Sequence, residues 1–259
     1  MINVLNAERI KLTSVKSPKW CAAIIVFLSI SIAALVGWVA SRSVAAGAGG
    51  KGQSEVLPNV AAATNGVSGL GVYVLMILAA LTVTSEYRFG VIRSTFQATP
   101  NRSRVLVAKA ILMGSVGAVL TLILALLALG VSKVFAGEAG GKNLVLSTGA
   151  DWRAVLGIPL FAALCAILGI GVGALVRQTA AAVAILILFP LLIESLFLMF
   201  GSFGEKVLPF LPFRNATYFL AVGDDSSFHW GHWGAFFYFA AMVFVVFGAA
   251  ILVVQRRDA

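Results

Sequence analysis

The stretch VLVAKAILMGSVGAVLTLILALLALGV, residues 105–131, contains a single charged side chain, that of Lys109. A helix needs about 20 mainly apolar residues to cross a bilayer, because its backbone N–H and C=O groups must be satisfied within the segment. This stretch is therefore predicted to span a membrane. Since it is longer than a bilayer requires, we expect its first turns to stand outside the hydrocarbon, with Lys109 at the level of the lipid head groups.

Five further segments have the same character. Of the 259 residues, 60% are hydrophobic and 11% are charged, a balance typical of membrane proteins and not of soluble domains. We predict an all-α membrane protein with one domain over residues 1–259. Its six spans are expected at about residues 20–40, 67–84, 105–131, 154–176, 179–200 and 234–254.

The basic residues predict the orientation of these spans. If both termini, the second-to-third connection and the fourth-to-fifth connection share one side, that side has 12 Lys and Arg against three acidic residues, and the other has seven against six. The positive-inside rule then places both termini in the cytoplasm. Because these residues flank the spans, the net charge of +9 indicates contact with the lipid bilayer and no nucleic-acid partner.

A charged stretch, SEYRFGVIRSTFQATPNRSR, occupies residues 85–104 between the second and third spans. Gly90 should interrupt the helix that leaves the second span, and residues 91–98 can form about two helical turns before a Pro-Asn pair ends them. Ile92 and Phe96, four residues apart, would share a face as an apolar anchor for a partner. Glu86 would pair with a nearby arginine, Arg88 or Arg93.

Residues 85–110 resemble the segment between the second and third spans of type-2 ATP-binding-cassette (ABC) permeases. In that family Glu-Tyr/Phe-Arg, a Gly-Thr-Ile-Arg-like run and Pro-x-Arg precede the third helix, and Val91 stands where Thr is usual. AERIKLTSVKSPKW, residues 7–20, is similar to the family's Glu-x-x-Lys-Leu-x-Ser start. LGIGVGALVRQTAAAVAILILFPLLIE, residues 168–194, is similar to its fourth-to-fifth span junction.

The resemblance implies the membrane subunit of an exporter in a bacterial plasma membrane. It would work as a dimer, with a second copy or a paralogue, and bind two separate ATPase subunits. The helix over residues 91–98 would be the coupling helix, and short re-entrant or interfacial helices would lie between the last two spans. The cargo would be an amphipathic or hydrophobic compound (a drug, peptide, lipid or glycolipid), moved outward by alternating access. The implied docking residues are Glu86, Arg88, Val91, Ile92, Arg93 and Phe96.

The chain has no phosphate-binding loop. Its two Gly-Lys pairs, at Lys51 and Lys142, are followed by Gly and Asn instead of Ser or Thr. We therefore expect that it is not an enzyme and carries no cofactor, and that ATP and Mg bind the partner ATPase.

The first residues predict an amphipathic helix at the membrane interface. Glu8 projects within its apolar arc, which a helix facing only lipid would avoid. With Lys11 it therefore favours contact with a protein partner over a simple membrane-surface helix. The apolar residues of the arc are Val4, Leu5, Leu12 and Val15.

Glu194 is the one acidic residue inside a predicted span and follows Pro190, which should kink the fifth helix. A carboxylate at this depth is a candidate for a translocation path or outer gate. It would pair with Arg214 or Lys206, or contact the substrate. If it instead carried a coupling ion, the chain would be an ion-coupled carrier.

Two weaker motifs point to different kinds of site. Residues 66–69, Gly-Val-Ser-Gly, match the Gly-x-Ser-Gly of rhomboid intramembrane proteases, but only His229 or His232, outside the spans, is available to activate Ser68. The two histidines with Asp224 and Asp225 have spacing that could hold a metal. An aromatic belt is the expected role of this stretch, and no metal site is predicted.

Small residues recur every four positions in two spans, which allows close helix contact within one chain or between copies. They are Ser29, Ala33 and Gly37 in the first span, and Gly169 and Gly173 in the fourth.

Overall fold

A computed structural model describes residues 2–45, 59–99 and 101–256. Six of its helices are long and apolar enough to cross a membrane, which confirms the prediction of an all-α membrane protein with six candidate spans. Five of them extend beyond the predicted apolar segments, because helical hydrogen bonding continues past the ends of those segments. The helix of the predicted span 179–200 instead ends at Phe197. They are Ser17–Ser43, Val60–Arg88, Arg102–Glu138, Gly149–Val176, Thr179–Phe197 and His232–Arg256.

The first half of the described chain contains α1 (Ile2–Ser14), α2 (Ser17–Ala45), α3 (Val60–Gly66), the π-helical turn η1 (Val67–Gly71), α4 (Val72–Arg88), α5 (Val91–Ala98), α6 (Arg102–Gly140) and η2 (Gly141–Leu144). The second half contains α7 (Gly149–Val176), α8 (Thr179–Leu188), the π-helical turn η3 (Phe189–Ile193), α9 (Glu194–Phe197), η4 (Leu198–Phe200), α10 (Ser202–Val207), η5 (Leu208–Phe210), α11 (Pro212–Leu220) and α12 (His232–Arg256).

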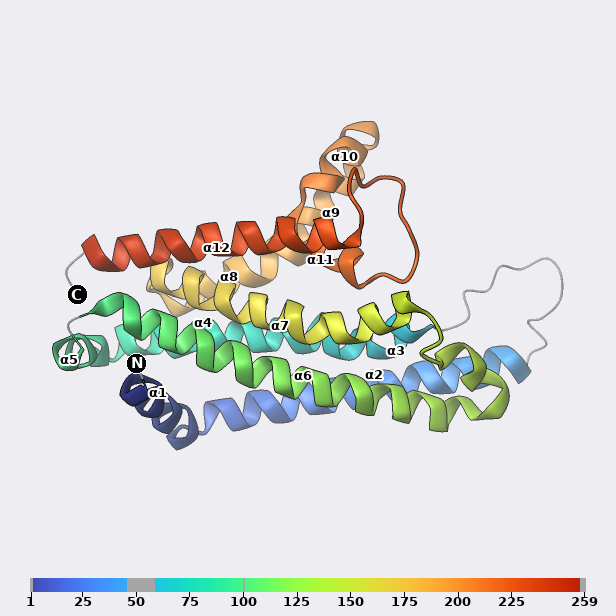
Figure 1. Cartoon of the computed structure of the whole chain (residues 1–259), viewed down its shortest axis with the longest axis horizontal. Helices are drawn as coiled ribbons and strands as arrows, with labels where there is room; N and C mark the ends of the chain where they lie inside the picture. The colour runs from blue at the N-terminus through green and yellow to red at the C-terminus, as the bar shows by residue number, and fades with distance from the viewer. Residues whose placement is uncertain (1, 46–58, 100, 257–259) are drawn as a thin grey trace.

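The long helices lie alongside one another, as Figure 1 shows, and this arrangement separates the two ends of the molecule. The short helices α1 and α5 lie at the end where the chain begins and finishes, while η2 and the α6–α7 connection lie at the other. The elements that the charge pattern assigns to one side of a membrane therefore share one end of the bundle.

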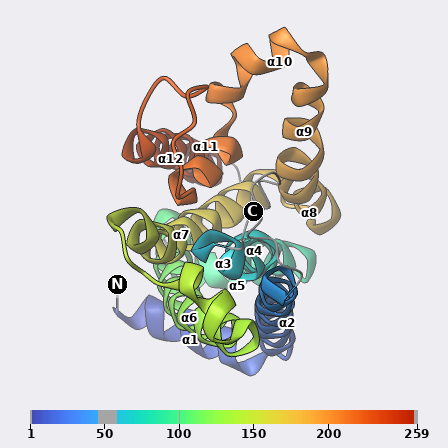
Figure 2. The same cartoon turned by 90° about the vertical axis from the view of Figure 1, so that its right-hand side faces the viewer.

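Helix α7 forms the centre of the bundle. It packs against α4 and α6 on one side and against α12 on the other, as Figures 1 and 2 show. Its side chains Ile158, Cys165 and Ile170 are fully buried. Helices α2, α8 and α12 are peripheral and turn large apolar side chains outward, as expected of surfaces that face lipid.

Both stripes of small residues are used within the chain. A Cβ at Gly169 would overlap the carbonyl oxygen of Met76, so the absence of a side chain lets α7 lie against the backbone of α4. Gly37 lies against the backbone of Ser132 in α6, whose hydroxyl donates to the carbonyl of Ala33 at 2.8 Å. These contacts fix α2 to α6 and α4 to α7.

Candidate functional site

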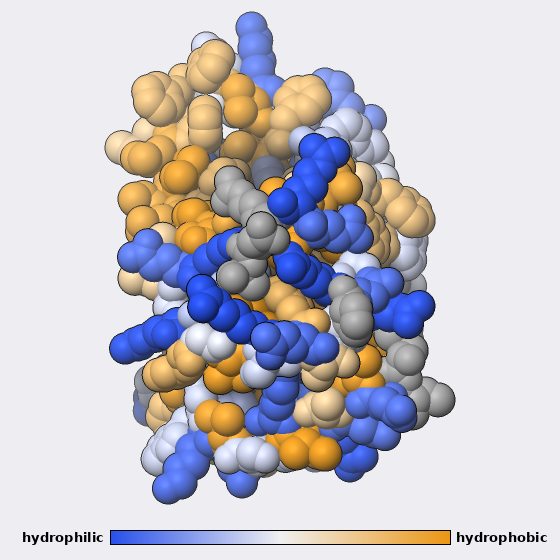
Figure 3. Space-filling view, turned by 90° about the vertical axis from the view of Figure 1, so that its left-hand side faces the viewer, coloured by the Kyte–Doolittle hydropathy of each residue, from blue (hydrophilic) through white to orange (hydrophobic). Residues whose placement is uncertain are grey.

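The end of the molecule that carries α5 is shown in Figure 3, where hydrophilic side chains gather across its face. Among the residues that the structure describes here, the acidic side chains of Glu8 and Glu86 are both buried. The exposed charge of this face is therefore basic. Its exposed basic residues are Arg9, Lys16, Lys19, Arg88, Arg93, Arg104 and Arg256.

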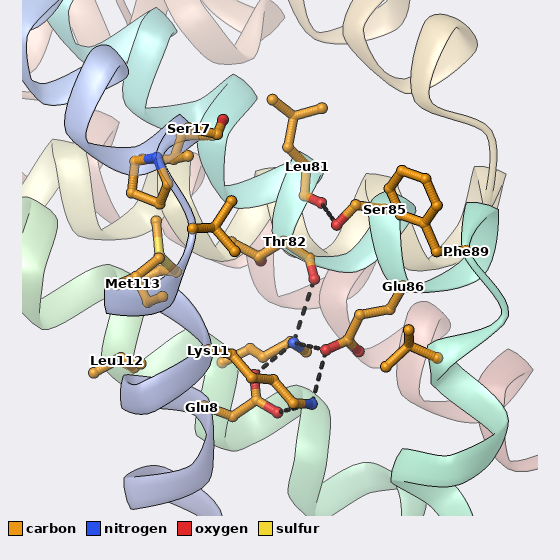
Figure 4. A pocket seen from close by; sticks show the side chains of 16 residues that line it. Glu8, Lys11, Ser17, Leu81, Thr82, Ser85, Glu86, Phe89, Leu112 and Met113 are labelled. Atoms are coloured by element: carbon orange, nitrogen blue, oxygen red, sulfur yellow. Dashed lines mark hydrogen bonds and ion pairs between the residues drawn. The ribbon is translucent and has the colours of Figure 1, made fainter.

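Four charged side chains meet just beneath this face (Figure 4), and we call them the ion-pair cluster: Glu8, Lys11, Glu86 and Lys109. The Lys109 Nζ lies 2.5 Å from Glu8 Oε2 and 2.9 Å from Glu86 Oε1. The Lys11 Nζ lies 2.9 Å from Glu8 Oε1 and 2.8 Å from the same Glu86 Oε1. Each lysine thus bridges both carboxylates, and the cluster joins α1, α4 and α6.

Two further hydrogen bonds complete the cluster. Lys109 donates to the backbone carbonyl of Thr82 at 3.3 Å, and Lys11 donates to the hydroxyl of Thr95 in α5 at 3.2 Å. Each ammonium group therefore has three acceptors, which matches its three N–H bonds. Because the charges balance and the donors are used, the cluster can tolerate burial that would be prohibitive for one unpaired charge.

The two carboxylates of the cluster raise the pKa of Lys11. Burial of its ammonium group acts to lower the pKa, but the hydrogen bonds and attraction of Glu86 and Glu8 act more strongly together and raise it above its ordinary value. Lys11 is therefore held in its charged form.

The cluster bears on two expectations about charged side chains. The side chain of Lys109 is buried among protein groups, with 3% of the residue exposed, and two carboxylates supply its counter-charges. Glu86 pairs with lysines of α1 and α6 instead of Arg88 or Arg93.

The position of Glu8 within the apolar arc of α1 predicted contact with a protein partner. In the structure Glu8 instead contacts Lys109 of α6 and Lys11 of its own helix.

The short helix α5 has the predicted bounds. Gly90 adopts φ 72°, a left-handed conformation that glycine tolerates best, and ends α4 so that α5 can leave in a new direction. The side chain of Asn101 caps the start of α6 by accepting from the N–H of Arg104. The starts of α5 and α6 are therefore set by local chemistry.

The buried face of α5 corrects the predicted docking anchor. Ile92 and Phe96 share a face, but both are buried in the chain's own apolar core instead of being offered to a partner. The guanidinium of Arg102 lies 5.3 Å from the ring centre of Phe96 and donates to the carbonyl of Val254 at the end of α12. Sequence spacing could identify this face but not what it would meet.

The outward surface of this corner consists of other residues. Phe89 is 72% exposed and Val91 43% exposed, and the side chains of Arg88 and Arg93 are exposed beside them. Arg88, Val91 and Arg93 were predicted from the sequence, but Phe89 was missed, since its one signal was an aromatic residue next to the interrupting glycine. We call these four residues the α4–α5 corner.

The connection between α7 and α8, which are the fourth and fifth spans, also contacts the end of α4. Arg177 adopts φ 58° at the end of α7, and its guanidinium lies 4.9 Å from the ring centre of Tyr87. The hydroxyl of Thr179 donates to that of Thr84 at 3.1 Å. The turn that resembled a family motif therefore holds α4 just beside the ion-pair cluster.

Glu194 has a structural partner that its sequence context did not reveal. Its carboxylate accepts the backbone N–H groups of Phe213 at 2.8 Å and Arg214 at 2.9 Å, at the start of α11, and 1% of the residue is exposed. The expected ion pair with the side chain of Arg214 or Lys206 is not among the described salt bridges, although the guanidinium of Arg214 lies near enough to attract the carboxylate. The direct contacts are these backbone bonds, since free N–H groups at a helix start attract a carboxylate. Pro190, where a kink was expected, lies in the π-helical turn η3 just before it.

The two histidines lie in an aromatic cluster. The ring of Tyr218 stacks between Phe228 and His232, with centroid separations of 4.2 and 4.4 Å, and His229 lies near the ring of Phe210. Of the residues weighed as metal ligands, His232 is 3.5 Å from Asp224, and the described residues include no group of three or more His, Cys, Asp or Glu placed to share a metal.

Ser68 lies in the π-helical turn η1. Its hydroxyl donates to the carbonyl of Thr64 at 3.2 Å. Among the described hydrogen bonds none joins it to a histidine.

No family model matches the chain, and no curated protein matches its sequence.

Proposed function

We propose that this chain is the membrane-spanning permease subunit of an ATP-driven exporter of the type-2 ABC kind. It would bind two ATPase subunits and a second permease copy or paralogue in a bacterial plasma membrane, with both termini in the cytoplasm. ATP and Mg would bind the ATPase subunits. The cargo would be an amphipathic or hydrophobic compound, which matches the apolar character of the spans.

The observation that carries the proposal is that α5 is attached both to the apolar core and to the ion-pair cluster. A short helix projects between α4 and α6, its inner face is buried through Ile92 and Phe96, and its Thr95 is bonded to Lys11 of the ion-pair cluster. A push on α5 would therefore move α4, α6 and α1 together, because cores and satisfied ion-pair networks shift as units. In this proposal α5 is the coupling helix and α1 an interfacial helix.

The α4–α5 corner supplies the docking surface. Phe89 would fill an apolar cleft on the ATPase with Val91 beside it, while Arg88 and Arg93 would form a polar rim that steers the encounter. An exposed aromatic residue flanked by arginines is the composition expected at the centre of a protein interface. The basic face in Figure 3 would suit both anionic lipid and an acidic partner surface.

An ion-coupled carrier and an intramembrane hydrolase have less support. Both carboxylate oxygens of Glu194 are engaged by backbone N–H groups of α11, which favours a role in fixing α11 over carriage of an ion. The hydroxyl of Ser68 donates to the carbonyl of Thr64 in the preceding helical turn, as serines in apolar helices commonly do, which favours a structural role over hydrolysis.

We expect a reading frame adjacent to that of this chain to encode an ATPase with a phosphate-binding loop, and the test is to co-express the chain with that ATPase and purify the complex in detergent. ATP hydrolysis is measured in detergent, and ATP-dependent movement of a fluorescent amphipathic dye is measured after reconstitution into vesicles. Phe89→Ala should weaken ATPase binding by about 2 kcal/mol or more if the ring occupies a desolvated cleft.

Phe237→Ala is the matched control, because Phe237 is 65% exposed on α12, away from the corner. Its complex should assemble and transport as the unchanged chain does. Equal behaviour of the two variants would refute the docking surface, and absence of ATP-dependent transport by an assembled complex would refute the exporter.

A further inference from the structure

Helix α11 lies alongside α12, and ring contacts place both of its ends along that helix (Figures 1 and 2). Near the C-terminus of α11 the ring centres of Phe219 and Trp233 are 5.3 Å apart. At its N-terminus those of Phe213 and Phe239 are 5.4 Å apart. Trp233 is 54% exposed in the first turn of α12, and tryptophans of spanning helices gather at the edge of the bilayer. Since Phe239 lies six residues further along α12, α11 begins about 9 Å inward from that edge.

Arg214, the third residue of α11, brings a cation to this depth. Side chains of a helix lean towards its N-terminus, which is here the deeper end. The guanidinium accordingly lies near enough to attract the carboxylate of Glu194, but no hydrogen bond or ion pair holds it among the described residues. A charged side chain inside a membrane pairs with a partner or lines a water-filled path. Arg214 therefore has charge available for a partner from outside the chain.

The hydroxyl of Tyr73 in α4 supplies a second donor beside Arg214. The ring centres of Tyr73 and Phe213 are 6.2 Å apart, and the hydroxyl lies within electrostatic reach of the Arg214 guanidinium. This hydroxyl also has no hydrogen-bond partner among the described residues. Every described side-chain atom that is both fully buried and unpaired belongs to another residue. The unpaired donors of Arg214 and Tyr73 are therefore accessible to a ligand.

Two accessible donors, one of them charged, fit an anionic oxygen group such as a phosphate or a carboxylate. A guanidinium binds such groups through charge-assisted hydrogen bonds, and a phenol hydroxyl can add one more. The nearby Glu194 does not occupy these donors, because both of its oxygens accept backbone N–H groups of α11. A cationic head group would be repelled by Arg214, and a neutral one would leave its charge unpaired.

An apolar surface adjoins the two donors. The three residues of η3 directly before Glu194 are each between 40% and 50% exposed, and they are Leu191, Leu192 and Ile193. A hydrocarbon chain could lie along them while an anionic group reaches Arg214. This combination favours an amphiphile over a free inorganic anion.

We infer that Arg214 and Tyr73 form a binding site for the anionic head group of an amphiphile whose apolar chain lies against η3. The site goes beyond the proposed function, because this chain can bind such a ligand without ATPase subunits. Failure of the site would therefore leave the exporter proposal standing.

The experiment uses the purified full chain in phosphatidylcholine nanodiscs and a dodecyl phosphate that carries a photoreactive diazirine in its chain. After illumination, labelled residues are mapped by mass spectrometry of peptides, and label is expected on η3 and α9. Unlabelled dodecyl phosphate should compete about tenfold more effectively than dodecanol, since a hydrogen bond to a charged group is worth about that factor. Inorganic phosphate should compete less than dodecyl phosphate. Equal competition by dodecanol or by inorganic phosphate would overturn the inference, because the site would then not recognise the charge or the chain.

Arg214→Gln removes the charge and should lower labelling of η3 about tenfold, while Arg214→Lys should keep part of it because the charge remains. Tyr73→Phe should lower it by a smaller factor, since one neutral hydrogen bond is lost. Lys206→Gln is the matched control, because Lys206 is an exposed cation on α10, and it should leave labelling unchanged. Equal loss in Arg214→Gln and Lys206→Gln would mean attraction to surface charge alone and would refute the site. Competition on the unchanged chain decides the matter even if Arg214→Gln fails to fold.

Discussion

The ammonium nitrogen of Lys109 lies 2.5 Å from a carboxylate oxygen of Glu8, although 101 positions separate the two residues in the chain. The pair fastens the first helix to the third spanning helix inside an otherwise apolar environment. Because Glu86 and Lys11 close the cluster, α1, α4 and α6 are tied at a single point. The stability of the bundle should therefore depend on each member of the cluster.

Removal of one cation from the cluster should lower the free energy of unfolding, because the buried carboxylates lose a balancing charge. Lys109→Met leaves Glu8 and Glu86 with Lys11 alone, and we expect it to destabilise the chain by about 3–5 kcal/mol, since breaking a buried pair leaves an uncompensated charge. Thermal unfolding of the detergent-solubilised chain measures the change. Combining Lys109→Met with Glu8→Gln removes one charge of each sign and should recover part of the loss.

Lys142→Met is the control for this series, because Lys142 is exposed at the opposite end of the bundle. It should unfold like the unchanged chain. A Lys109→Met variant that matches this control would show that the cluster does not form in the protein.

The docking of α1 should depend on pH in one direction. The pKa of Lys11 is raised above 10.5 in the folded chain, so its contribution is fully present below that value and is lost as the pH rises through the raised pKa. Spin labels at the exposed positions Ile10 and Ile111 report the distance between α1 and α6. We expect a constant distance from pH 7 to about pH 10 and a longer one in stronger alkali.

Lys11→Met removes the titrating group and provides the comparison. If the distance in the unchanged chain begins to lengthen near neutral pH, Lys11 is not the group that holds α1 by its charge.

The close contact of α7 with α4 should not tolerate a side chain. Gly169→Ala places a Cβ against the carbonyl oxygen of Met76, and we expect a loss of about 1–3 kcal/mol from overpacking. Gly130→Ala, in α6, meets nothing within 4 Å and should be neutral or stabilise by up to about 1 kcal/mol, because alanine favours helix. Unfolding midpoints of the two variants, measured side by side, distinguish packing from helix propensity.

Glu194→Gln tests whether the carboxylate fixes α11. Glutamine keeps the shape but turns a donating NH₂ group towards a backbone N–H, so we expect a loss of about 1–3 kcal/mol of stability. Glu205→Gln, at an exposed position, is the control. Normal stability combined with altered pH dependence of transport would instead support the ion-coupled carrier.

The orientation is tested by labelling in intact cells. Arg93→Cys and Lys142→Cys are made separately in a chain whose Cys21 and Cys165 are replaced by alanine. The two positions lie at opposite ends of the bundle. An impermeant thiol reagent should react at position 142 and not at position 93, because the charge pattern places Arg93 in the cytoplasm; the reverse result would invert the topology.

Much of the architecture followed from local sequence. The six spans and the helix over Val91–Ala98, with an interruption at Gly90 and an end before the Pro-Asn pair, were predicted because each depends on residues close together in the chain. The face shared by Ile92 and Phe96 was also predicted. The role predicted for this face, an apolar anchor for a partner, was wrong, because both residues are buried in this chain. Periodicity identifies residues on one face but does not say whether that face meets a partner or the chain itself.

The order of residues alone was enough to establish a helical chain with six segments able to span a membrane, because a backbone in lipid must satisfy its hydrogen bonds within each segment. The meeting of Lys109 with Glu8, and the capping of α11 by Glu194, became visible only in the folded bundle. These contacts join residues that are distant in the chain. Their existence depends on which helices pack together, and that choice is set by side-chain shape and charge across the whole bundle.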